Sequence, residues 1–113
     1  MNSTPLLPTD PLQFIRHCVG NGNIVWTFHV DMRLTTKRIN RRTIVDSVSS
    51  YEIIESYPDD KYLPSYLVYT EYRGERLHIL FAVDVEGENV RVVTTYRPSD
   101  ARWMPDLRTR RTL

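Results

Sequence analysis

A histidine and several cations stand at helical spacing between Phe28 and Ile39, in the stretch FHVDMRLTTKRI. His29, Arg33 and Lys37 recur at intervals of four residues, so a helix would place them on one face. An imidazole titrates near neutral pH, and guanidinium and ammonium groups hold phosphate oxygens. Together these groups could take up a proton and stabilise charge on a phosphate, which RNA cleavage without a metal ion requires.

Each of these residues also has a structural interpretation, and both interpretations stay open. His29 follows an apolar stretch and could be half-buried, bonded to a backbone carbonyl. Arg33 could be a solvated cation or the partner of Asp31, and Lys37 a surface cation. Arg38 could bind a phosphate or point inward to a carboxylate at the junction of two helices.

A second group of candidates lies in the C-terminal half of the chain. His78 alternates with apolar residues, so it is either a catalytic group on an open sheet face or a structural histidine of the sheet. Tyr96 and Arg97 end the last predicted strand, where functional loops are often attached. Tyr96 could donate a proton in catalysis or stack on a base, and Arg97 could bind RNA. Arg108 and Arg110 belong to a basic tail, which is either an RNA-binding segment or a solvated end.

The charge of the chain is segregated along the sequence rather than large overall. The 113 residues carry a net charge of +1, so no global field attracts nucleic acid. All basic residues except Lys37 and Lys61 are arginine, whose planar fork matches phosphate geometry. Five cations fall within residues 33–42, and five arginines against two aspartates fall within 97–111. A GC-rich genome, which favours arginine codons, would explain the arginine excess but not this clustering.

Several classes of site and location are disfavoured. The single cysteine, Cys18, forms no internal disulfide and no cysteine-rich zinc site, and three dispersed histidines do not predict a metal site. The sequence contains no glycine-rich phosphate loop, so it does not indicate a nucleotide cofactor. No apolar run is long enough to span a bilayer, and Met1 to Asp10 is polar and interrupted by proline. We therefore expect a cytoplasmic protein with no metal and no cofactor.

The hydrophobic pattern changes from helical spacing to alternation after Ser50. We expect a flexible arm over residues 1–9 and one domain over 10–113. The predicted helices cover residues 10–20, 29–37 and 40–50, and the predicted strands cover 51–57, 65–72, 77–85 and 89–96. The apolar run at residues 24–26 is short, and residues 28–30 could extend it. The expected class is α+β, with N-terminal helices packed on a four-stranded antiparallel meander.

The order of these signals resembles a known bacterial family. "HVDMR" precedes an Arg-Ile pair and "RRTIVDSV", followed by "RLHILFAVD", "VVTTYRP" and "ARWMPDLRTR". This pattern, over about residues 24–111, is similar to the family catalogued as domain of unknown function 4258, which looks related to BrnT-like and RelE-like toxins. The helix at 10–20 and the acidic start of "PDDKYLPS" depart from the family pattern.

The resemblance implies a RelE/BrnT-like fold and a toxin-like, metal-independent endoribonuclease that acts on messenger RNA. It implies two partners, RNA and a cognate antitoxin, and no membrane. The expected assembly is a homo-oligomer or a complex with the antitoxin. The alternatives are a non-catalytic module of the same fold that binds protein or nucleic acid, and a small-molecule pocket on the open sheet face.

Overall fold

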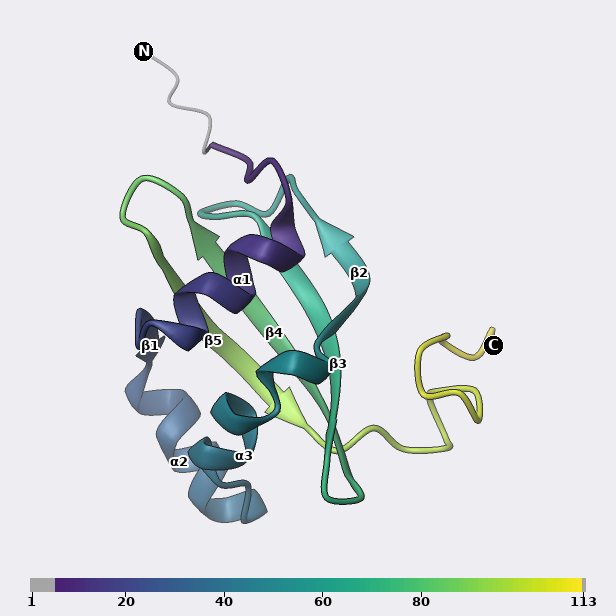
Figure 1. Ribbon diagram of the computed structural model, residues 1–113. Helices are drawn as coiled ribbons and strands as arrows, with labels where there is room; N and C mark the ends of the chain where they lie inside the picture. Colours follow the sequence, from purple (N-terminus) through teal and green to yellow (C-terminus); the bar gives the residue numbers. More distant parts are fainter. Residues whose placement is uncertain (1–5, 113) are drawn as a thin grey trace.

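The computed structural model describes residues 6–112, which form helices in the first half of the chain and a meander in the second (Figure 1). The elements are α1 (Pro11–Gly20), β1 (Ile24–Trp26), α2 (Phe28–Lys37), α3 (Arg41–Asp46), η1 (Val48–Ser50), β2 (Glu52–Tyr57), β3 (Ser65–Tyr72), β4 (Glu75–Asp84) and β5 (Asn89–Tyr96). The predicted positions of these helices and of the four long strands are confirmed. Residues 6–9 carry no helix or strand, and the rest of the predicted arm, residues 1–5, lies outside the described residues.

The sheet has five strands in the order β1-β5-β4-β3-β2. The strands β2 to β5 pair antiparallel, each with the next along the chain, as a meander does. The fifth strand, β1, pairs parallel with β5 through Ile24 and Val90. The sheet is therefore mixed, which corrects the expectation of a purely antiparallel sheet of four strands. A three-residue strand is too short to show alternation, and its partner lies far along the chain.

Buried side chains of α1, α2 and α3 join those of the strands in one main apolar core. Alternate residues of the strands, such as Val68, Ile79, Phe81 and Val92, point from one sheet face into this core and are fully buried. The helices contribute further buried apolar side chains, namely Ile15, Cys18, Val19, Val30, Leu34 and Ile44. Cys18 is thus a core residue. In residues 6–112, no helix combines the length and apolar character needed to cross a membrane.

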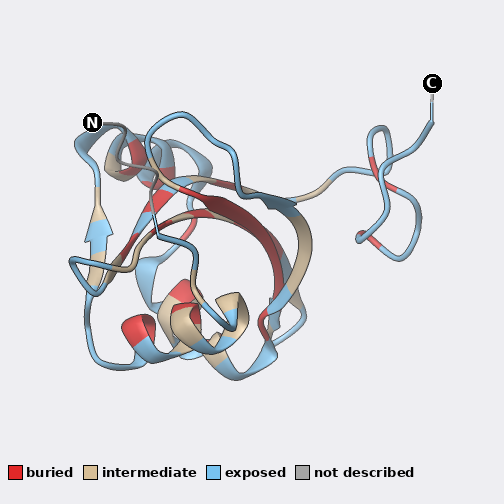
Figure 2. Ribbon diagram, turned by 90° about the horizontal axis from the view of Figure 1, so that it is seen from above, coloured by how far each residue is buried: buried red, intermediate tan, exposed pale blue. Residues whose placement is uncertain are grey.

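The other sheet face is covered in part by the C-terminal segment, residues 103–111, which leads to the end marked C at the right of Figure 2. Trp103 and Leu107 pack there against Leu67 and Tyr69 and form a second apolar cluster. Trp103 is only 2% exposed. The segment is consequently a docked part of the fold, although it contains no regular helix or long strand.

The helix that carries the N-terminal candidates, α2, begins and ends at defined caps. The Thr27 hydroxyl accepts a hydrogen bond from the Val30 amide at 3.2 Å, as an N-cap does. Val30 and Leu34 share the buried side. The helix ends where Arg38 adopts a left-handed conformation with φ of 55°. The caps therefore fix the ends of α2, and the burial of Val30 and Leu34 fixes which side faces solvent.

Candidate functional site

The exposed side of α2 forms a groove of about 260 Å³, which we call the α2 groove. It is lined by His29, Met32, Arg33, Thr36 and Lys37. The predicted convergence of His29, Arg33 and Lys37 on one helix face is confirmed, and all three are exposed. His29 is therefore not the half-buried residue of the structural interpretation.

The α2 groove ends beside the last residues of β5. The Lys37 ammonium lies 3.5 Å from the Thr95 carbonyl oxygen and 6.0 Å from the centroid of the Tyr96 ring. Tyr96 is half-buried. The C-terminal end of α2 thus brings a predicted phosphate-binding cation against a predicted catalytic tyrosine.

Arg97 caps α2 rather than standing free at the strand end. Its guanidinium donates to the Lys37 carbonyl oxygen at 2.7 Å, to that of Arg38 at 3.1 Å and to the Glu75 carboxylate at 2.6 Å. These bonds satisfy carbonyls that the helix itself leaves unpaired. Arg38, the residue that ends the helix, is exposed and does not point into the core.

His78 is fully buried, so of its two interpretations the structural one holds and the catalytic group on an open sheet face does not. Its Nε2 donates to the Leu107 carbonyl oxygen at 2.6 Å, and its Nδ1, 3.2 Å away, accepts from the Tyr96 hydroxyl. The ring meets Trp103 edge-on with centroids 4.4 Å apart. Because the C-terminal segment covers it, His78 has no open path to a substrate. It orients the Tyr96 hydroxyl and anchors the segment.

His78 should make stability depend on pH. Burial lowers the pKa of His78 below its ordinary value of 6.5, although the bond to the Leu107 carbonyl opposes the shift. Below about pH 6.5 the unfolded chain takes up a proton that the folded chain does not, so unfolding is favoured. We expect this contribution to be complete above about pH 6.5 and to be lost as the pH falls through the lowered pKa.

The comparison variant for this dependence is His78→Gln, whose amide can keep both hydrogen bonds. Urea unfolding at several pH values between about 7.5 and 5 should show the free energy of unfolding falling more steeply for the native chain than for His78→Gln. Parallel profiles for the two proteins would show that His78 does not control this dependence.

The two predicted RNA-binding arginines of the tail are engaged with the acidic strand β2. Arg108 pairs with Glu52 at 2.8 Å and stacks over Tyr69 at 4.1 Å. Arg110 pairs with Glu55 at 2.7 Å. The paired guanidinium lowers the pKa of the Glu55 carboxyl, against the effect of burial. These contacts correct the picture of a free basic tail, since both guanidiniums hold the C-terminal segment on the sheet.

A second, more polar cavity of about 350 Å³ lies on the other side of Tyr96. We call it the arginine pocket; its lining residues are Tyr96, Arg97, Ser99, Arg102, Trp103 and Arg110. Sequence reasoning did not single out Ser99 or Arg102. The clustering of five arginines in residues 97–111 was the available signal, but it did not indicate which of them would converge.

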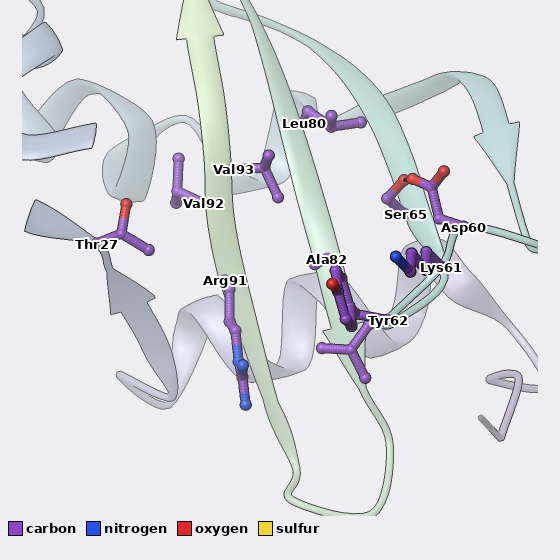
Figure 3. Close-up of a pocket in the computed structure, with 11 residues that line it drawn as sticks. Thr27, Asp60, Lys61, Tyr62, Ser65, Leu80, Ala82, Arg91, Val92 and Val93 are labelled. Carbon is purple, nitrogen blue, oxygen red and sulfur yellow. Dashed lines mark hydrogen bonds between the residues drawn. The ribbon is translucent and has the colours of Figure 1, made fainter. Parts of the chain in front are cut away.

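The uncovered part of the second sheet face holds an apolar cavity of about 390 Å³ (Figure 3). Leu80 and Ala82 of β4 and Val93 of β5 line it, with Tyr62 from the loop between β2 and β3.

Phe28 and Met32 on α2 are also largely exposed, at 79% and 57%. In the described part of the chain, no three His, Cys, Asp or Glu side chains gather as a metal site would require.

The comparison with protein families places most of this sequence in a family. The family described as Domain of unknown function (DUF4258) matches residues 26–97. No curated protein and no solved structure matches this chain. The matched region runs from the end of β1 to Arg97, and so contains α2, the meander and the Lys37–Tyr96 contact. Because it covers more than half of the sequence, the chain belongs to the DUF4258 family.

Proposed function

We propose that this protein is a toxin-like endoribonuclease that cleaves RNA without a metal ion and binds the RNA backbone along the α2 groove. The observation that carries the proposal is the line of His29, Arg33 and Lys37 in one open groove that ends at Tyr96. A histidine beside two cations provides both a proton acceptor and donors for phosphate oxygens.

The reaction centre in this proposal is the pair of His29 and Arg33, one helical turn apart. His29 takes the proton from a 2'-hydroxyl, and the 2'-oxygen forms a bond to the adjacent phosphorus. Arg33 stabilises the negative charge that builds on the phosphate oxygens. The bond from phosphorus to the 5'-oxygen then breaks, and the 5'-oxygen takes a proton from a water molecule, whose hydroxide takes the proton that His29 holds. The products are a 2',3'-cyclic phosphate and a 5'-hydroxyl.

Lys37 and Tyr96 address a neighbouring part of the RNA. His29 and Lys37 are eight residues apart on α2, which corresponds to about 12 Å along the helix axis. The Tyr96 side chain at the far end therefore holds the next nucleotide rather than the reacting phosphate. Burial raises the pKa of its phenol further above neutral pH, so the hydroxyl stays protonated.

The remaining parts of the proposal follow the family resemblance. We propose a cytoplasmic toxin of the RelE/BrnT-like fold, with RNA as substrate and a cognate antitoxin as protein partner. The exposed apolar side chains of Phe28 and Met32 beside the groove offer a surface that an antitoxin could cover or a base could contact.

The test incubates the purified chain with a mixed-sequence single-stranded RNA, with and without EDTA. We expect cleavage that EDTA does not reduce, and fragments that end in 2',3'-cyclic phosphate. Expression of the chain alone should arrest growth of a bacterial host. Intact RNA together with normal growth would contradict the proposal, and cleavage abolished by EDTA would contradict its metal-independent form.

A second candidate is an RNA-binding module that does not cleave. The burial of His78 favours it, because only His29 remains as an open histidine in the candidate site. In this case the chain binds RNA with an affinity that falls steeply as salt rises, and the RNA stays intact. A binding partner whose affinity changes little with salt would instead be a protein.

A further inference from the structure

Three segments of the chain form the walls of the arginine pocket. The end of β5 supplies Tyr96 and Arg97, the following turn supplies Ser99 and Arg102, and the last part of the chain supplies Arg110. The Ser99 carbonyl oxygen accepts from the amides of Arg102 and Trp103, at 3.2 and 3.0 Å, which closes this turn. No carboxylate is among the lining residues.

Two of the three guanidiniums are held in place from the rim. Arg97 is fixed by Glu75 and by the last carbonyls of α2, and Arg110 is fixed by Glu55. The Arg102 side chain is exposed, and it makes no ion pair and no hydrogen bond within residues 6–112. Three cations against two rim carboxylates leave one positive charge without compensation, and it is carried by Arg102.

The Trp103 ring in the pocket wall is covered by its neighbours. Trp103 is 2% exposed, with His78 against one side of its ring and Arg110 4.7 Å above it. The Tyr96 hydroxyl is held by His78. A ligand therefore meets guanidinium forks and hydroxyl groups rather than an open aromatic face.

We propose that the arginine pocket binds a single phosphate group, with Arg102 as the main phosphate-binding residue and the Ser99 hydroxyl as an additional hydrogen-bond donor. Guanidinium forks bind a phosphate through paired hydrogen bonds, and those of Arg97 and Arg110 are already oriented. The phosphate comes from a terminal phosphomonoester or from a backbone phosphodiester of RNA. That RNA supplies the phosphate rests on the proposed function, whereas binding of the phosphate group itself does not.

The first experiment uses inorganic phosphate as the probe and two charge-matched variants. Sodium phosphate is titrated into the ¹⁵N-labelled full chain, with sodium chloride used to hold the ionic strength constant. We expect amide shifts confined to residues 96–103, to Arg110 and to the Trp103 indole. Arg102→Gln should weaken binding by about tenfold or more, because a charge-assisted hydrogen bond is lost.

Arg91→Gln is the control, since Arg91 is an exposed arginine near the start of β5 that pairs with Asp84 at 3.6 Å and lines a different cavity. It should bind phosphate like the native chain. Shifts spread equally around Arg91, or equal affinities of Arg102→Gln and Arg91→Gln, would overturn the assignment of the pocket.

The second experiment identifies the source of the phosphate with 2'-O-methyl oligonucleotides, which cannot be cleaved through the 2'-oxygen. A 5'-phosphorylated oligonucleotide that binds more tightly than its 5'-hydroxyl form, with the advantage lost in Arg102→Gln, indicates a terminal monoester. Equal binding of both forms, weakened in Arg102→Gln, indicates a backbone phosphate. If inorganic phosphate binds but neither oligonucleotide does, the pocket stands and the proposed action on RNA fails.

Discussion

Replacing His29 with alanine should lower the rate of RNA cleavage by roughly 10² to 10⁴-fold, the usual contribution of a positioned general base. Arg33→Ala should lower it by roughly 10² to 10³-fold, because the developing phosphate charge loses a donor. Both side chains are exposed in the α2 groove, so each variant should keep its stability within about 0.5 kcal/mol of the native chain. Cleavage rates and thermal unfolding, measured on the same preparations, separate the two effects.

Arg42→Ala is the matched control for this pair of variants. Arg42 lies on α3 with a side chain that is 83% exposed, and its only ion pair among the described residues is with Asp46, four positions along. It should cleave RNA at the native rate. If His29→Ala keeps full activity, or if Arg42→Ala loses as much as Arg33→Ala, the α2 groove is not the reaction site. A large fall in melting temperature for His29→Ala would return this residue to a structural role.

Trp103→Ala should destabilise the fold by about 3–5 kcal/mol, the usual effect of removing a large aromatic side chain from a core. Trp103 is the largest side chain of the cluster under the C-terminal segment and covers His78. For a chain of this size the melting temperature should fall by roughly 10 to 20 °C. The loss of cover should also hydrate the His78 ring and move its pKa upward, toward the ordinary value, which an NMR titration can follow.

Two variants bracket this result. Trp103→Phe keeps an aromatic ring against His78 and should lose much less stability than Trp103→Ala. Met104→Ala changes a neighbouring side chain that is 40% exposed, so it should cost about 1 kcal/mol or less. If Trp103→Ala melts within about 2 °C of the native chain, the C-terminal segment does not stabilise the sheet in solution.

The elements that were predictable are those whose signals are local. Asp10 before Pro11 indicates a helix start, the four-residue spacing from His29 to Lys37 indicates one helix face, and the alternation around Phe81 indicates a buried strand face, each within a few residues. The strand β1 escaped this reasoning because three residues show no period. Its identity depends on pairing with β5, which follows more than sixty positions later.

The candidate site divides in the same way. His29, Arg33 and Lys37 share a groove because helical spacing alone brings them together. The sequence left open whether His78 stands on an open sheet face or is a structural histidine, because alternation gives the side of the sheet and not what covers that side. The segment that covers it is irregular, and it docks through Trp103 and through ion pairs to β2.

The sequence by itself determined the helices, the four long strands, the cationic face of α2 and the resemblance that the DUF4258 match confirms. Only the tertiary structure decided that His78 is buried, that Arg108 and Arg110 hold the C-terminal segment, and that Arg102 meets Tyr96 in one pocket. The physical reason is the distance along the chain over which each effect acts. Backbone periodicity and capping act over a few neighbouring residues, whereas the environment of a charged group depends on which distant segment packs against it.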